Sequence, residues 1–77
     1  MISAYILVTW KTGIDEKKTL EDISKIKGVK EVNHVFGIYS LIVKIQAESD
    51  EELKDIIYDK IRKHPNISST VTMLVVD

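Results

Sequence analysis

The order in which strand-like and helix-like stretches follow one another constrains this 77-residue sequence more than any other feature. Residues 2–10 are rich in β-branched and aromatic side chains, a composition typical of a strand. In residues 14–28, apolar side chains recur three residues apart between charged ones, which predicts a helix with one apolar face. Gly28 stands where a left-handed residue would end that helix. The chain therefore begins with a strand followed by a helix.

The same alternation returns in the second half of the chain. Residues 29–36 predict a weaker, partly exposed strand, and residues 39–47 predict a stronger one. The sequence SDEE at 49–52 has the form of a capping box, which predicts the start of a second helix. We expect this helix to stop before the His-Pro pair at 64–65, because the residue before a proline is disfavoured in helical conformation. Residues 69–76 predict the last strand.

The resulting order is β-α-β-β-α-β, in a single domain that covers residues 1–77. Two β-α-β units with right-handed crossovers interleave into a four-stranded antiparallel sheet that carries both helices on one face. No linker or low-complexity segment interrupts this order. The sequence therefore predicts an α+β fold of the ferredoxin-like plan.

Apolar residues fall on both faces of the predicted sheet. The first strand places Tyr5 and Leu7 opposite its main apolar side, the third strand leaves Ile42 there, and the last strand is apolar on both sides. Two helices cover only one face, and burying apolar area contributes about 25 cal/mol per Å². We therefore expect a second copy to pack against the other face around a two-fold axis, as a homodimer. The uncharged strand at 69–76, predicted at a sheet edge, also favours self-association.

The residue types limit the chemistry that this chain supports. Because there is no cysteine, disulfides, zinc thiolate sites and redox thiols are excluded. His34 and His64 follow no repeated ligand spacing, so we expect no metal site and no cofactor. The carboxylates gather on the predicted helix faces, where solvation and the helix dipole account for them, so we predict no catalytic residue. Trp10 and Phe36 are expected in the core or an interface, because they lack flanking basic residues.

Charge and hydropathy argue against nucleic acid and membrane as direct partners. Eleven basic and twelve acidic residues leave a net charge of -1. The basic stretch at 59–64 is expected to be the end of a helix, where cations suit the dipole. No apolar run approaches the ~20 residues that a membrane span needs, and no signal-peptide pattern begins the chain. We therefore expect a soluble, cytoplasmic protein.

Three short motifs in their order resemble a known family. GVKEV at 28–32, GIYS at 37–40 and TVT at 70–72, on a βαββαβ frame, resemble the ligand-binding (RAM) domain of the Lrp/AsnC, or feast/famine, regulators. The resemblance runs from about residue 3 to residue 76 and implies a stand-alone RAM domain without the usual helix-turn-helix. It implies a non-enzymatic amino-acid sensor whose dimers form through the sheet face and assemble into an octamer or decamer. It also implies co-assembly with full-length Lrp/AsnC regulators.

By this resemblance, an amino-acid effector binds between dimers, near the turn between the second and third strands and near the last strand. Gly37, Tyr39 and Ser40 match the family's G-x-Y-D stretch, and Thr70 and Thr72 match its polar positions on the last strand. A glycine lets backbone N–H groups approach a carboxylate, and two threonines at i and i+2 share one strand face. Ser40 departs from the pattern, which commonly has Asp there, and a serine cannot hold an ammonium with a charge-assisted bond. Binding is therefore expected to be weakened or altered in preference.

Two other functions remain open. The first is a structural protein with the same assembly and no ligand, in which Gly37 is an ordinary turn glycine and the two threonines are plain strand formers. The second is a small enzyme of the dimeric α/β-barrel kind, which the lack of acid and base groups argues against. An ACT-type domain shares the fold and ligand class, but its ligand loop follows the first strand, where KTGID at 11–15 offers one glycine.

Overall fold

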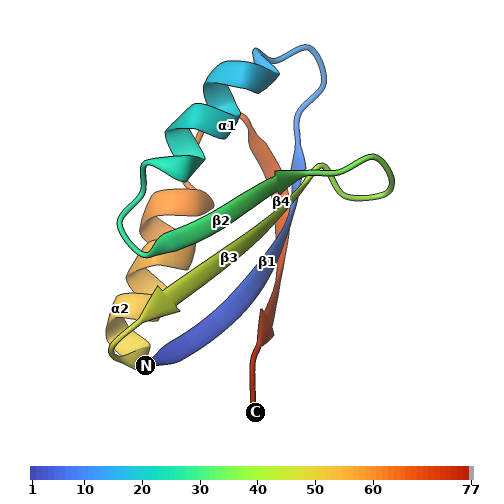
Figure 1. Cartoon of the computed structure of the whole chain (residues 1–77). Helices are drawn as coiled ribbons and strands as arrows, with labels where there is room; N and C mark the ends of the chain where they lie inside the picture. The colour runs from blue at the N-terminus through green and yellow to red at the C-terminus, as the bar shows by residue number, and fades with distance from the viewer. Residues whose placement is uncertain (77) are drawn as a thin grey trace.

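The two β-α-β halves of the chain interleave in space. The computed structural model describes residues 1–76. In chain order the elements are β1 (Ile2–Trp10), α1 (Glu16–Ser24), β2 (Val29–His34), β3 (Leu41–Ala47), α2 (Asp50–Lys54), the π-helix η1 (Asp55–Ile61) and β4 (Ile67–Leu74). The strands pair antiparallel in the spatial order β2-β3-β1-β4, with the helices on one face (Figure 1). The predicted ferredoxin-like α+β fold, with β4 at an edge, is confirmed.

The first helix is shorter than the sequence predicts. It ends at Ser24, whereas the apolar spacing predicted a helix over 14–28. The Ile26 N–H donates to the Ile23 carbonyl at 3.2 Å, three residues back, so the chain has tightened into a turn that keeps the same apolar spacing. Gly28 does take a left-handed φ of 97°, but it lies in the turn before β2 rather than at the helix end.

The second helix begins as predicted and then changes type. The Ser49 hydroxyl accepts a hydrogen bond from the Glu52 N–H at 3.1 Å, which caps the first turn. From Asp55 to Ile61 the chain is π-helical, and the Arg62 N–H donates to the Ile57 carbonyl, five residues back, at 2.9 Å. The sequence pattern did not predict this wider helix, because apolar spacing alone does not separate 3.6 residues per turn from a looser winding over two turns. The helical segment ends before the His-Pro pair, as expected.

The hydrophobic core lies between the sheet and the helices. Its main side chains are Ala4, Ile6 and Val8 from β1, Leu41, Val43 and Ile45 from β3, and Ile23, Leu53, Ile56, Ile57 and Ile61 from the helices. Thr19 of α1 is fully buried among them. Its hydroxyl donates to the Asp15 carbonyl at 2.8 Å and accepts from Asn66 Nδ2 at 2.9 Å, so the buried polar group is satisfied.

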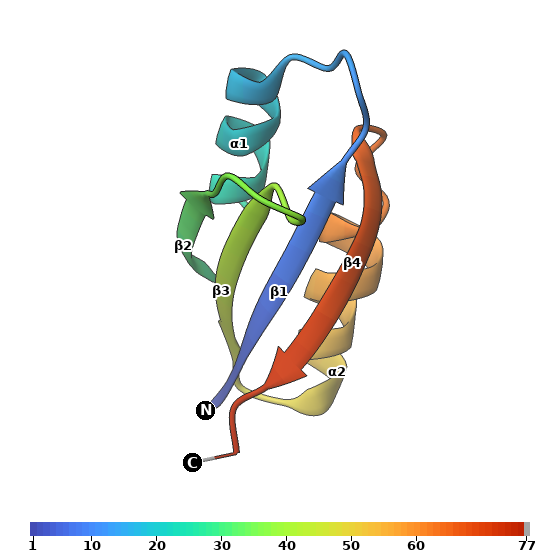
Figure 2. The same cartoon turned by 90° about the vertical axis from the view of Figure 1, so that its right-hand side faces the viewer.

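The opposite face of the sheet carries no helix, as Figure 2 shows. The register places Tyr5 opposite Met73, and Leu7 between Ile42 and Val71, on this open face. Val71 and Met73 are nearly half exposed, at 45% and 46%. The prediction that apolar side chains occupy both faces, with helices enough for one, is confirmed.

Candidate ligand-binding site

The loop between β2 and β3 is closed at its base by main-chain hydrogen bonds. The Val35 N–H donates to the Ser40 carbonyl at 2.9 Å, and the Ser40 N–H donates to the Val8 carbonyl at 2.7 Å. The residues between them project beyond the end of the sheet (Figure 1). At the tip, Phe36 is fully exposed and Ile38 is 88% exposed. The loop therefore presents two large apolar side chains to solvent from a fixed base.

A depression of about 240 Å³ lies beside this loop, and we call it the hairpin depression. Its lining residues are Trp10 from β1, Glu16 from α1, and His34, Val35, Phe36, Gly37, Tyr39 and Ser40 from the β2–β3 connection. Pockets for drug-sized ligands have roughly 300–1,000 Å³, so a depression of this volume has room only for a smaller molecule. The depression offers such a ligand apolar, hydroxyl and carboxylate groups.

The five residues identified from the family resemblance fall into two groups in the chain. Gly37, Tyr39 and Ser40 all line the hairpin depression. Thr70 pairs with Val8 and Thr72 pairs with Ile6 across the β1–β4 ladder, so both threonines lie on the helix-facing side of β4.

The two groups do not meet within one chain. Thr72 lines a second hollow of about 220 Å³, beside Leu53, Ile57 and Tyr58 of the second helical segment. Strand β1 lies between β3, which follows the loop, and β4, which carries the threonines. A site that uses both groups therefore needs a neighbouring copy to bring them together.

The backbone of this chain does not by itself require a glycine at position 37. Its positive-φ glycines are Gly13 and Gly28, and a Cβ built on Gly37 meets no atom within 4 Å. A methyl group would be accommodated there in an isolated chain. The missing side chain matters only if another molecule, a ligand or a neighbouring copy, approaches the loop closely.

Ser40 takes part in the structure of the loop. Its hydroxyl oxygen accepts a long hydrogen bond of 3.4 Å from the Trp10 N–H, which ties the loop to the end of β1. A hydroxyl can accept one bond and still donate its own proton, so Ser40 remains able to donate to a bound molecule.

Glu16 brings a carboxylate to the hairpin depression. The sequence pattern predicts only a solvated helix face for this residue, not a site. The order of the elements does predict that Glu16 lies near the loop. In a β-α-β unit the helix begins beyond the carboxyl end of its first strand, and the β2–β3 loop lies at that same end of the sheet.

Two rings form one wall of the depression. The ring centroids of Trp10 and His34 lie 5.0 Å apart, tilted by 58°. Trp10 also packs against the core, as predicted. Phe36, for which the sequence predicts a core or an interface position, lies outside the core and is fully exposed. His34 is exposed at the end of β2, as predicted, but it lines this depression as well.

Other kinds of site find little support in residues 1–76. In that range no three His, Asp or Glu side chains gather as metal ligands. None of its helices has the length and apolar character that crossing a bilayer demands. The basic stretch does end the second helical segment, where Lys63 pairs with Asp59 at 3.3 Å and the Arg62 guanidinium lies 5.3 Å from the Tyr58 ring.

The fold and the depression define a class: a small ferredoxin-like α+β domain with an uncovered sheet face and an amino-acid-sized hollow at the β2–β3 loop. The family model for the Lrp/AsnC ligand binding domain matches residues 3–77. The chain belongs to this family. Its domains are effector-sensing and oligomerisation modules of transcription regulators, and they form dimers and higher oligomers that bind amino-acid effectors.

Three similar proteins show where such a domain occurs. An HTH-type transcriptional regulator of Pyrococcus abyssi is 35% identical over 77 residues, covering 97% of this chain and 51% of the regulator. This chain thus spans about half the length of that relative. The crystal structure of FFRP-DM1 has 37% identity and a TM-score of 0.91, covering 99% of this chain and 100% of that one. A homocitrate synthase of Sulfurisphaera tokodaii is 38% identical over 74 residues, covering 96% of this chain and 16% of the enzyme.

Proposed function

We propose that this chain is an amino-acid-sensing and oligomerisation module that modulates full-length Lrp/AsnC regulators by joining their assemblies. The observation that carries the proposal is the hairpin depression, where the Glu16 carboxylate, the Ser40 hydroxyl and the unhindered backbone of Gly37 meet in a chain of this family. This combination suits a ligand with an ammonium and a carboxylate group.

The open sheet face supports the first step of assembly, a homodimer. Leu7, Ile42 and Val71 form a row across three neighbouring strands, and Tyr5 and Met73 form the next row. Covering these side chains with the same face of a second copy removes apolar surface from water at about 25 cal/mol per Å². A two-fold axis lets the same patch serve both copies.

The loop tip supports the second step, the association of dimers into an octamer or decamer. Phe36 and Ile38 are exposed to solvent and bury little apolar surface within their own chain. Their apolar side chains would contribute a favourable free energy only where another molecule covers them. A neighbouring dimer that packs on the loop would also bring its own Thr70 and Thr72 towards the hairpin depression. The five predicted residues would then form one site between dimers.

The carboxylate of Glu16 gives this site a cation partner despite the serine at position 40. Charge-assisted hydrogen bonds are roughly twice as strong as neutral ones. In the proposed site Glu16 accepts from the ligand ammonium, and the backbone around Gly37 donates to the ligand carboxylate. The Ser40 hydroxyl contributes a weaker, neutral bond.

The experiment is a calorimetric screen of the 77-residue chain against the twenty amino acids, with light scattering after size-exclusion chromatography in parallel. We expect at least one amino acid to bind and the free chain to be larger than a dimer. Loss of that binding in Glu16→Gln, with Glu51→Gln as the control, would place the ligand beside Glu16. A chain that stays monomeric at micromolar concentration would overturn the proposal.

A structural protein without a ligand is the second candidate. It is favoured by the bond from the Trp10 N–H to the Ser40 hydroxyl, which gives this serine a role in holding the loop. Under this alternative the assembly forms, but the screen finds no ligand for the native chain or for Ser40→Asp.

The proposed host of the module is a full-length Lrp/AsnC regulator. Similar domains form part of an HTH-type transcriptional regulator in one relative and of a homocitrate synthase in another. Such a domain therefore accompanies more than one kind of protein. Co-purification of mixed assemblies with a full-length Lrp/AsnC regulator is the result expected here.

A further inference from the structure

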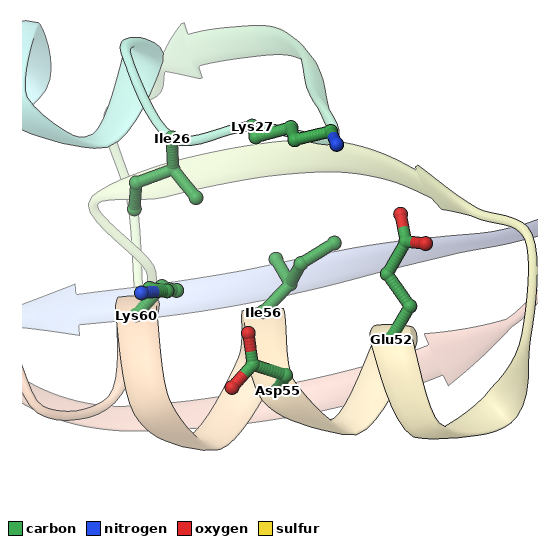
Figure 3. Close-up of a pocket in the computed structure, with 6 residues that line it drawn as sticks. All are labelled: Ile26, Lys27, Glu52, Asp55, Ile56 and Lys60. Carbon is green, nitrogen blue, oxygen red and sulfur yellow. The ribbon is translucent and has the colours of Figure 1, made fainter.

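A cleft of about 490 Å³ lies between the turn after α1 and the helical segment formed by α2 and η1 (Figure 3). We call it the interhelical cleft. Its lining residues are Ile26 and Lys27 from the turn, and Glu52, Asp55, Ile56 and Lys60 from the helical segment. None of them lines the hairpin depression, and the cleft has about twice the volume of that depression.

The floor of the cleft is apolar and fixed. It consists of Ile26 from the turn and Ile56 from η1, whose side chains point toward each other in Figure 3. A Cβ on Gly28 would lie 2.5 Å from the Ile56 Cδ1 atom and 3.0 Å from the Gln46 carbonyl oxygen. The turn therefore approaches Ile56 this closely only because residue 28 has no side chain.

The π-helix places opposite charges on the same side of the cleft. Asp55 and Lys60 are five residues apart within η1. In an α-helix with 3.6 residues per turn, residues five apart point in different directions. Winding with i→i+5 hydrogen bonds brings them onto one side, and π-helical segments are frequent at functional sites. Both residues line the cleft.

The four charged side chains that line the cleft are two acids and two lysines. Asp59 lies beside two of them, since a hydrogen bond with Asp55 and the charge of Lys60 lower the pKa of Asp59. Within residues 1–76, Lys27, Glu52, Asp55 and Lys60 form no ion pair of 4.0 Å or less. In the view of Figure 3, Lys27 and Glu52 lie toward one end of the cleft and Lys60 toward the other, with Asp55 below Ile56 between them. Two cations and two anions thus surround an apolar floor.

We propose that the interhelical cleft is a second binding site, for a zwitterionic molecule with an apolar part, namely an α-amino acid with an apolar side chain. An anion such as phosphate would be repelled by Glu52 and Asp55, and a polycation by the two lysines. An uncharged apolar ligand would form no interaction with the four charged groups. An apolar amino acid places its side chain on the half-buried Ile26, beside the edge of the buried Ile56, and pairs both of its charges.

This site stands independently of the hairpin depression, and either can exist without the other. The charged groups are exposed to solvent, which screens them. The apolar floor is therefore needed for binding, and the charges select the ligand class. Single-charge analogues should bind more weakly than the amino acid itself.

The test uses the full 77-residue chain with ¹³C-labelled isoleucine δ1 methyl groups, which stay visible by NMR in large assemblies. Ile26 and Ile56 report on the interhelical cleft, and Ile38 reports on the loop beside the hairpin depression. The probes are L-leucine, 4-methylpentanoate, which lacks the ammonium, and 3-methylbutylamine, which lacks the carboxylate. We expect L-leucine at millimolar concentration to shift the Ile26 and Ile56 signals saturably, and each analogue to bind at least about tenfold more weakly.

Exposed charge variants test the assignment of the ligand's partners. Lys60→Gln and Asp55→Asn should each weaken L-leucine binding by about two- to fivefold, since each removes a solvent-exposed charged partner. Lys25→Gln, an exposed lysine outside the cleft, is the matched control and should change nothing. The proposal is overturned if L-leucine leaves the Ile26 and Ile56 signals unmoved. It is equally overturned if the analogues shift those signals as strongly, or if the cleft variants bind like the native chain.

Failure here is distinguishable from failure of the proposed function. A ligand that shifts Ile38 while Ile26 and Ile56 stay in place supports the hairpin depression and refutes the interhelical cleft. The converse result supports the cleft alone. Shifts at Ile26 and Ile56 that follow protein concentration without any ligand would show that a second copy occupies the cleft, which also refutes the proposal.

Discussion

The Nε2 atom of His64 lies 3.0 Å from the Oδ2 atom of Asp22. This contact links α1, which carries Asp22, to the turn before β4, which carries His64. His64 Nδ1 accepts the Asn66 N–H at 3.1 Å, so in the neutral ring Nε2 carries the proton and donates to Asp22. The other carboxylate oxygen of Asp22 accepts from Lys18 Nζ at 3.1 Å. This network connects the two β-α-β halves of the chain through polar groups rather than through the core.

The first prediction concerns acid stability. The hydrogen bond from His64, and then that from Lys18, holds the pKa of Asp22 below its ordinary value of 3.8. Because the folded pKa is lower than the unfolded one, ionised Asp22 stabilises the fold above 3.8, and this contribution is lost as the pH falls through the folded pKa. Asp22→Asn should therefore lower the free energy of unfolding at neutral pH and flatten its decline below 3.8.

Urea unfolding of both chains over this pH range is the measurement. Glu21→Gln, an exposed neighbour on the same helix, serves as the control and should retain the native pH profile. If Asp22→Asn and the native chain lose stability in parallel on acidification, the contact between Asp22 and His64 contributes nothing to the acid limb.

The second prediction separates two costs of replacing a glycine. Gly13 and Gly28 both have positive φ, but only Gly28 has atoms within contact distance of an added Cβ. Gly13→Ala should cost only the conformational penalty, about 1–2 kcal/mol. Gly28→Ala should cost about 1–3 kcal/mol more, because Ile56 and the Gln46 carbonyl must move. Thermal unfolding of the two variants gives the comparison, and equal losses would contradict the close approach at Gly28.

The order of the elements could be predicted from the sequence, whereas the exact end of one helix and the type of another could not. Hydrophobic periodicity and the turn residues predicted the order of elements, the open face and the edge position of β4. They did not predict the end of α1 at Ser24, because an apolar spacing of three fits a helix and a tight turn equally. The π-helix was missed for a similar reason, since it depends on which carbonyl each N–H selects.

The candidate site was less predictable than the fold. Gly37, Tyr39 and Ser40 follow one another in the chain, so family resemblance could identify them together. Glu16 comes from a distant part of the sequence and reaches the hairpin depression only through the topology. In the proposed site, Thr70 and Thr72 would join this group only through contacts between copies, which a single sequence encodes only as exposed apolar surface.

The third prediction concerns the open sheet face. Leu7→Lys and Val71→Lys place charges at neighbouring positions of this face, where a second copy would have to bury them. Each should reduce the assembly to smaller species while the circular dichroism spectrum stays native. Light scattering after size-exclusion chromatography measures the change, and an unaltered mass for both variants would show that this face is not the dimer interface.

Residues on the helix side cannot serve for this test. From the strand pattern alone, Val8→Asp or Val43→Asp would be expected either to reduce the assembly or to abolish folding. Both side chains are fully buried against the helices. A carboxylate there would be buried without a partner, so the expected outcome is unfolding rather than dissociation.

The last prediction concerns the hairpin depression. Because a Cβ on Gly37 meets no atom of its own chain, Gly37→Ala should leave the free energy of unfolding unchanged but weaken amino-acid binding, as the added methyl group blocks the ligand. Ser40→Asp should strengthen binding of at least one amino acid by about 1 kcal/mol or more, because it adds a second carboxylate beside Glu16 for the ammonium. Thr72→Val, similar in shape but without the hydroxyl, should weaken binding without altering the assembly. Calorimetric titration of the three variants, with light scattering as the check on assembly, measures these effects. Native affinity in Gly37→Ala together with no gain in Ser40→Asp would assign the loop a purely structural role.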